Sequence, residues 1–76
     1  MWSFDTFKIG NTECECQTKH VDEECPEYGI YGGKIIKMFI KADGEWIAEF
    51  ERDPEDLFIK DETAKKAVAF LVSKYN

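Results

Sequence analysis

The sequence predicts an α+β domain: a four-stranded antiparallel β-sheet made of two hairpins, with one C-terminal helix packed on one face. Apolar and polar residues alternate on both sides of Gly10-Asn11, and again on both sides of Ala42-Asp43-Gly44, which is typical of half-buried strands. Residues 61–75 carry apolar side chains at helical spacing. We therefore expect the 76 residues to form a single domain, 1–76, with the element order ββββα.

The first hairpin is predicted over about residues 3–20, with a two-residue turn at Gly10-Asn11. This turn places Lys8 opposite Glu13 and Phe7 opposite Cys14. Alternation then directs every second residue of the returning strand inward. The inward set is Thr12, Cys14, Cys16, Thr18 and His20.

A glycine-rich loop over 21–33 leads to the second hairpin, at about 34–52. A three-residue turn, Ala42-Asp43-Gly44, is preferred here because Gly44 accepts the left-handed conformation that ends such a turn. The resulting register pairs Lys41 with Glu45 on one face and Ile40 with Trp46 on the other. One face then pairs opposite charges and the other pairs apolar groups, which a half-buried hairpin requires.

A turn over 53–60 leads to the helix, which is predicted at about 61–75. Acidic residues near its start and Lys74 near its end suit the helix dipole. Its apolar stripe is expected to cover one face of the sheet. The stripe consists of Ala64, Ala67, Val68, Leu71, Val72 and Tyr75.

The net charge of −6 is uneven, because residues 1–33 contribute −5 of it. Direct nucleic-acid binding needs basic contacts to phosphates and is therefore not expected. The chain has no apolar run long enough to cross a membrane, and its start does not resemble a signal peptide. Its odd number of cysteines, 3, argues against a disulfide framework. We therefore expect a cytoplasmic protein with reduced thiols.

All three cysteines and the only histidine lie within residues 14–25. Cys14, Cys16, His20 and Cys25 form the right ligand set for a zinc site, which would stabilise so small a domain. A Cys-x-Cys pair on a flat strand, however, separates its Cα atoms by about 6.5 Å and lacks the tight knuckle of structural zinc sites. We expect no metal or other cofactor here, and expect the strand cysteines to be small core residues.

Alternation also directs several apolar side chains away from the helix, and a contiguous exposed patch of this kind marks an interaction surface. This outer set is Trp2, Phe4, Ile35, Phe39 and Ile47. Alternatively, a loop covers the set, or a bulge turns Trp2 and Phe4 inward. The covering residues would be Tyr28, Ile30 and Tyr31, or Leu57, Phe58 and Ile59. The loop after residue 27 offers a second candidate contact, through Tyr28, Tyr31 and Lys34.

Three short segments carry a family resemblance. Lys19-His20-Val21-Asp22-Glu23, Glu27-Tyr28-Gly29-Ile30 and Gly32-Gly33-Lys34-Ile35 resemble the pattern K-H-x-D-E, then E-Y-G-I-x-G-G-R-I-S-K-L, found in small uncharacterised proteins of bacteria and phages. The resemblance implies a strand pair followed by a C-terminal helix, and a domain of unknown function. Lys34 stands where the family has arginine, and Ile36 stands where it has serine.

No acid–base pair, oxyanion donors or cofactor motif can be assembled from the sequence, so we expect no catalysis. The main hypothesis is a protein-interaction module that binds an unknown protein partner and is itself a monomer or a weak homodimer. Two alternatives stay open. One is an acidic inhibitor or DNA mimic of phage or mobile-element origin, and the other is a zinc-stabilised small module.

Overall fold

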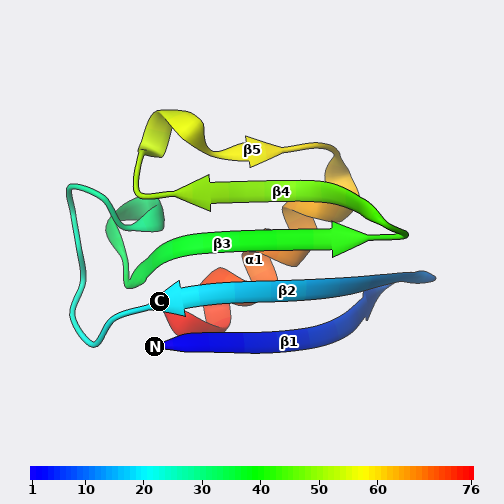
Figure 1. Ribbon diagram of the computed structural model, residues 1–76, viewed down its shortest axis with the longest axis horizontal. Coiled ribbons are helices and arrows are strands. Elements are labelled where there is room, and N and C mark those ends of the chain that lie inside the picture. Colours follow the sequence, from blue (N-terminus) through cyan, green and yellow to red (C-terminus); the bar gives the residue numbers. More distant parts are fainter.

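The computed structural model describes residues 1–76, apart from the side chain of Pro54. Five strands form one antiparallel sheet in sequence order, as Figure 1 shows. The strands are β1 (Trp2–Ile9), β2 (Thr12–His20), β3 (Ile35–Ala42), β4 (Glu45–Glu51) and β5 (Phe58–Ile59). The remaining elements are the 3₁₀ turns η1 (Ile30–Gly32) and η2 (Pro54–Asp56) and the helix α1 (Glu62–Tyr75).

The α+β class and the C-terminal helix are confirmed, but the sheet has five strands rather than four. The additional strand, β5, lies within the segment expected to be a turn, 53–60. It pairs with β4 through Ala48 with Ile59 and Glu49 with Phe58. A two-residue strand is too short to show a periodic pattern, so alternation could not reveal it.

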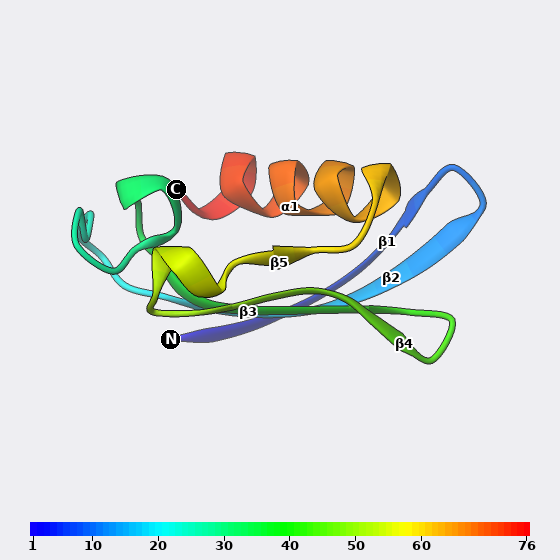
Figure 2. The ribbon, with the colours of Figure 1, turned by 90° about the horizontal axis from the view of Figure 1, so that it is seen from above.

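The helix covers one face of the sheet, and the other face is left open by the described chain (Figure 2). Asp61 caps the helix, because its Oδ1 accepts a hydrogen bond from the Ala64 backbone nitrogen at 2.9 Å. At the other end the Asn76 backbone nitrogen donates to the Val72 carbonyl oxygen at 3.0 Å. The helical side chains buried against the sheet are Ala64, Ala67, Val68 and Leu71.

The first hairpin has the predicted register, with Lys8 opposite Glu13 and Phe7 opposite Cys14. Gly10 adopts a φ of 62° in its turn, a conformation that glycine tolerates. The inward direction of the β2 cysteines is confirmed, because Cys14 and Cys16 are both buried in the core beneath α1.

The second hairpin has a two-residue turn, and the expected three-residue turn is wrong. Asp43 and Gly44 both adopt positive φ, 52° and 78°, as a tight hairpin turn of this hand requires. Lys41 consequently pairs with Trp46. A β-bulge at Ile47 then inserts one residue into β4, which turns Trp46 outward and Ile47 inward. Ile47 therefore belongs to the core and not to the outer face.

Ile35 is also in the core, because a second irregularity shifts the pairing of β2 with β3. Lys19 pairs with Lys37, but His20 pairs with Ile35, so β3 has one extra residue there. Ile35 is fully buried and packs with the residues beneath α1. Simple alternation fails at both bulges, and it misplaces one isoleucine at each.

Thr18 is fully buried on β2, and its Oγ1 has no hydrogen-bond partner among the described residues. We expect Thr18→Val to be neutral or to raise the free energy of unfolding by up to about 1 kcal/mol, because it removes an unsatisfied hydroxyl at almost constant volume. Urea unfolding followed by circular dichroism measures this, with the exposed Thr6→Val as the control. A clear loss of stability specific to Thr18→Val would show that the hydroxyl is bonded.

Candidate interaction surface

The outer face of the sheet carries a row of side chains that crosses all five strands. Successive register pairs connect Phe4, Gln17, Phe39, Glu49 and Phe58 in that order. The neighbouring row, at the end of the sheet where β1 and β3 begin, contains Trp2, Lys19, Lys37 and Glu51. The row on the hairpin side contains Thr6, Glu15, Lys41 and Trp46.

Five aromatic side chains on these rows form what we term the outer aromatic cluster: Trp2, Phe4, Phe39, Trp46 and Phe58. The ring of Phe39 stacks on Trp2, with centroids 6.5 Å apart, and meets Trp46 edge to face at 6.2 Å. Phe39 is thus the centre of the cluster. Phe4 is 72% exposed, and the other three members around Phe39 are between 43% and 46% exposed.

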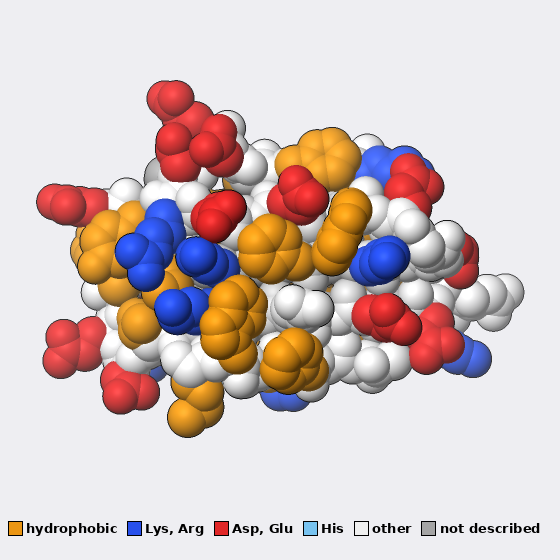
Figure 3. All heavy atoms as spheres, in the orientation of Figure 1, with side chains coloured by type: hydrophobic (Ala, Val, Ile, Leu, Met, Phe, Trp, Pro, Cys, Tyr) orange, Lys and Arg blue, Asp and Glu red, His pale blue; other side chains and the backbone are white. Residues whose placement is uncertain are grey.

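Charged side chains surround the cluster, as the space-filling view of this face shows (Figure 3). Lys41 lies over the Trp46 ring, with its Nζ 5.4 Å from the centroid. The Lys37 Nζ lies 3.2 Å from the Glu51 Oε1. A shallow hollow of about 210 Å³ is lined by Phe4, Phe39 and Trp46 among others. The surface is therefore aromatic around Phe39, with Gln17 and Glu49 between the rings of the central row and further charged side chains on both sides of it.

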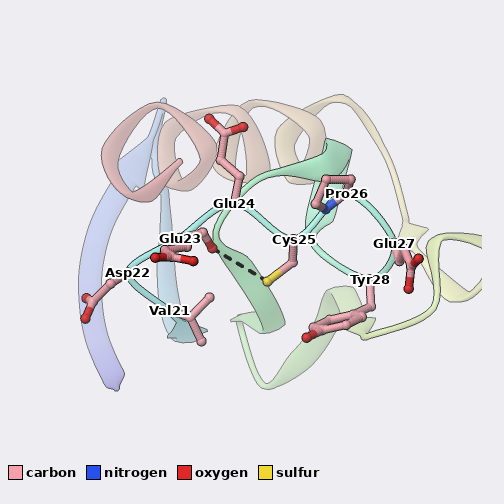
Figure 4. Close-up of a pocket in the computed structure, with 8 residues that line it drawn as sticks. All are labelled: Val21, Asp22, Glu23, Glu24, Cys25, Pro26, Glu27 and Tyr28. Carbon is pink, nitrogen blue, oxygen red and sulfur yellow. Dashed lines mark hydrogen bonds between the residues drawn. The ribbon is translucent and has the colours of Figure 1, made fainter.

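Tyr28, Tyr31 and Lys34 lie outside this surface. Figure 2 shows η1 on the helix side of the sheet, beside the end of α1. Tyr31 is 69% exposed there, and Tyr28 lies under the Arg52 guanidinium at 5.9 Å. Among the described residues, no ring contact joins Tyr28 or Tyr31 to Trp2 or Phe39, although the Tyr28 ring points away from α1 (Figure 4).

The backbone of the glycine-rich loop forms hydrogen bonds with the side chain of Asn76, the residue that follows α1. The Asn76 Oδ1 accepts hydrogen bonds from the backbone nitrogens of Lys34 and Ile35, at 2.9 and 3.1 Å. Its Nδ2 donates to the Ile30 carbonyl oxygen at 3.2 Å. A Cβ at Gly33 would lie only 2.3 Å from Asn76 Cγ. The loop backbone therefore serves to fix α1, which gives the Gly32-Gly33 pair a structural role.

The acidic loop before η1 encloses an open hollow of about 680 Å³, lined by residues 21–28 (Figure 4). The carboxylates of Asp22, Glu24 and Glu27 point in three different directions. The Cys25 thiol donates a hydrogen bond to the Glu23 carbonyl oxygen at 3.6 Å. These side chains do not converge on one point, so the hollow offers no assembled ligand set.

The four zinc candidates are also not assembled. Cys14 and Cys16 are buried in the core, and Cys25 lies in the loop. The His20 ring stacks on Tyr75, with centroids 4.5 Å apart, and its Nε2 lies 2.9 Å from the Ser3 Oγ. Among the described residues, no three His, Cys, Asp or Glu side chains form a group that could hold a metal ion.

Burial also makes the strand thiols poor nucleophiles. Burial, together with the nearby Asp43 and Asp61, raises the pKa of Cys14. Burial again, together with Cys14 and Asp5, raises the pKa of Cys16 to about 12. Because the thiolate is the reactive form, burial and the raised pKa both lower the reactivity of these two thiols in the folded protein.

We therefore expect an alkylating reagent to modify only Cys25 in the native protein, because Cys25 is partly exposed. Cys14 and Cys16 should react only when the protein unfolds, at the rate of global opening. Peptide mass spectrometry after timed iodoacetamide treatment, with and without urea, measures this. Modification of Cys16 as fast as Cys25 would contradict the burial of β2.

A polar contact joins β1 to the end of α1 on the inner face. The Asp5 side chain, 12% exposed, accepts hydrogen bonds from Lys74 Nζ and from the Tyr75 hydroxyl, the latter at 2.6 Å. Burial alone would raise the pKa of Asp5, but the bonds from Lys74 and Tyr75 outweigh it and lower the pKa below the ordinary value. This contact is structural, because both its partners belong to α1.

Sequence reasoning missed two members of the outer aromatic cluster. Trp46 was expected to face Ile40 inside, because the longer turn was assumed. The Asp-Gly pair at 43–44 is itself a two-residue turn signal and could have corrected that register. Phe58 lies in β5, for which the sequence gives no periodic signal. The alternative in which 57–59 cover the outer face is wrong, because Leu57 and Ile59 pack against the core while Phe58 extends the exposed face.

The fold and this surface define a small sheet-and-helix domain with one face covered by a helix and the other open and aromatic. A family model described as "Domain of unknown function (DUF7678)" matches residues 1–76, and the chain belongs to this family. This agrees with the resemblance of its Lys-His and Gly-Gly motifs to a family of uncharacterised small proteins. A search of curated proteins and a search of solved structures each found no match. No helix among the described residues combines the length and apolar character needed to cross a membrane.

Proposed function

We propose that this chain is a non-catalytic protein-interaction module whose contact surface is the outer aromatic cluster. The observation that carries the proposal is the gathering of five aromatic side chains on a sheet face that no other element of the described chain covers. Single exposed apolar residues are ordinary on protein surfaces, but the three rings in contact at Phe39, namely Trp2, Phe39 and Trp46, with Phe4 and Phe58 on the same face, are not. Aromatic side chains at the centre and charges at the rim are the composition of protein interfaces.

The positions of the groups with shifted pKa support a non-catalytic role. Strongly perturbed carboxyls and thiols often mark active sites in clefts. Here the pKa values of Asp5, Cys14 and Cys16 are shifted, and all three side chains lie on the face beneath α1. Each shift follows from core burial or from a contact with the helix, so none of the three is offered to a substrate on the open face.

The distribution of charges on the outer face supports the alternative function, a DNA mimic, less well than it supports a protein contact. A mimic of a phosphate backbone needs acidic groups in a continuous row. On the outer face, Lys19, Lys37 and Lys41 interrupt the acids across both rows beside Phe39. The protein-contact hypothesis is therefore preferred.

The test is affinity capture from a lysate of the source organism with three immobilised forms: wild type, Phe39→Glu and Tyr31→Glu. We expect a protein that is retained by wild type and by Tyr31→Glu, resists added salt, and is lost with Phe39→Glu. Salt resistance is expected because the rings of Trp2, Phe39 and Trp46, which are in contact, are apolar. Capture that is unaffected by Phe39→Glu but abolished by Tyr31→Glu would assign function to the loop and contradict the proposal.

A further inference from the structure

We propose that the partner bound by the outer face is a second copy of this chain, packed face to face about a two-fold axis that runs along β3. This inference rests on the proposed function, since it names the occupant of the same surface. A closed dimer of this kind uses the same patch on both copies, so the patch must be complementary to itself.

The central row of the outer face meets this requirement. Because β3 is the middle strand of five, the axis exchanges β2 with β4 and β1 with β5. The row alternates aromatic and polar residues and keeps that order when it is reversed. Its sequence is Phe4, Gln17, Phe39, Glu49, Phe58. The axis therefore places Phe39 against its own copy, and Phe4 against Phe58 of the other copy.

The neighbouring charges fit the same axis. Exchange of β2 with β4 brings Lys19 to Glu51 of the other copy, since both belong to the row of Lys37. Lys37 and Lys41, both on β3, each meet their own copy. The Lys37 charge is already paired with Glu51 in its own chain at 3.2 Å, and the Lys41 Nζ lies over the Trp46 ring, 5.4 Å from its centroid. An axis running across the strands would bring Lys37 to Lys41 of the other copy and would in addition stack Glu49 on Glu49, and like-charge repulsion disfavours that additional contact.

The size of the face is also suitable. The molecule measures 33 × 22 × 17 Å, so its broad side spans 33 × 22 Å. A standard stable interface buries about 800 Å² per partner. Two sheets packed with their strands nearly aligned lie about 10 Å apart, with side chains interdigitating, and the outer aromatic side chains are long enough to fill that layer.

Pairing through the free edge of β1 is the competing route to a dimer. Asp5 points inward from β1 into its contact with α1, and Lys8 points outward from the same strand. Inward charges and lysines on an edge strand discourage the addition of another strand. The face is therefore favoured over the edge as the dimer contact.

The first experiment is sedimentation equilibrium of the full chain over a wide concentration range. We expect a monomer–dimer equilibrium, and we expect Phe39→Glu and Phe4→Glu each to raise its dissociation constant by roughly 100-fold, as charges placed in an apolar contact. Phe4 is highly exposed in the monomer, so its substitution should leave the fold intact. Tyr31→Glu, an equally drastic change off the face, should leave the dissociation constant unchanged.

A charge exchange tests the axis. Lys19→Glu alone and Glu51→Lys alone should each weaken the dimer roughly tenfold, because each places like charges together twice. The double variant Lys19→Glu, Glu51→Lys should regain most of the wild-type affinity. Lys65→Glu on the exposed side of α1 is the matched control and should change nothing.

The inference is overturned if the wild type stays monomeric at every concentration, or if the dimer persists in Phe39→Glu and Phe4→Glu. It is also overturned if the double variant Lys19→Glu, Glu51→Lys fails to regain affinity, or if the monomer binds a single-stranded oligonucleotide through this face. A monomeric wild type whose captured protein is still lost with Phe39→Glu would end the dimer inference and leave the proposed function standing, so the two fail separately.

Discussion

Replacing Gly29 with alanine should destabilise the protein by roughly 3 kcal/mol or more, a large share of the about 5–15 kcal/mol that stabilises a typical domain. The added Cβ would lie 2.0 Å from the Gly33 carbonyl oxygen and 2.7 Å from the Cys25 carbonyl oxygen. Both atoms belong to backbone that is itself hydrogen-bonded, since the Cys25 nitrogen donates to the Gly33 oxygen at 2.9 Å. The backbone cannot yield without losing that bond.

Urea unfolding of Gly29→Ala against Gly44→Ala measures this effect. Gly44 adopts a φ of 78° and has open space around its Cβ position, so its substitution carries only a conformational penalty of about 1 kcal/mol. Gly29 has an ordinary φ of −84°, so its loss should come from close packing alone. Equal effects at the two glycines would contradict the tight loop.

A double-mutant cycle connects the same loop to α1. Gly33→Ala should destabilise the wild type, because its Cβ would overlap the Asn76 side chain. In an Asn76→Ala background the obstructing atoms are gone, so Gly33→Ala should have much less effect. We expect a coupling free energy of about 1–2 kcal/mol. Additive effects would show that Asn76 does not occupy the loop.

The second large effect is expected at Asp5. Asp5→Asn should lower the free energy of unfolding by about 1–3 kcal/mol near neutral pH, because it removes a mostly buried carboxylate that accepts bonds from Tyr75 and Lys74. The Lys74 side chain is 47% exposed, so solvent screens its charge and Tyr75 supplies the greater part of the effect.

The lowered pKa of Asp5 determines how its contribution to stability changes with pH. The pKa of Asp5 is lower in the folded protein than its ordinary value of 3.8. Its contribution is therefore complete above pH 3.8 and is lost as the pH falls through the folded-state pKa. The stability difference between wild type and Asp5→Asn should be constant at neutral pH and shrink in acid. Glu13→Gln, an exposed strand carboxyl, is the control. A difference that persists undiminished in acid would contradict the charge-assisted contact.

Alternation predicted which side of β1 and β2 faces the core, because each strand is regular and its turn at Gly10-Asn11 has a distinct signature. The helix and its first residue can also be predicted from the sequence, since Asp61 and the apolar stripe are local signals. The direction of the side chains that β1, β2 and α1 contribute to the core can therefore be predicted from residues close together in the sequence.

The second hairpin could be predicted only in part, for a physical reason. One extra residue reverses the direction of every later side chain, and a bulge leaves no mark in composition. The bulge at Ile47 exchanged the expected positions of Ile47 and Trp46. As a result, alternation places Trp2, Phe4 and Phe39 on the outer face correctly but places Trp46, another of the five aromatic side chains there, in the core.

The long-range contacts of the loop were beyond sequence reasoning. Nothing in the spacing of the Gly29–Gly33 segment indicates that it receives Asn76, which lies more than forty residues later. The pattern of glycines and tyrosines instead suggested a contact loop. The exposed tyrosines are real, but the glycines are explained by close packing of the backbone.

Tryptophan fluorescence quenching tests the central claim most directly, namely that the aromatic face opposite α1 is open in the free chain. Both tryptophans of the protein, Trp2 and Trp46, lie on that face. In dilute protein, acrylamide should quench both readily, and their emission should be that of solvated indole. Blue-shifted emission that resists acrylamide at high dilution would show the face to be covered and would contradict the account.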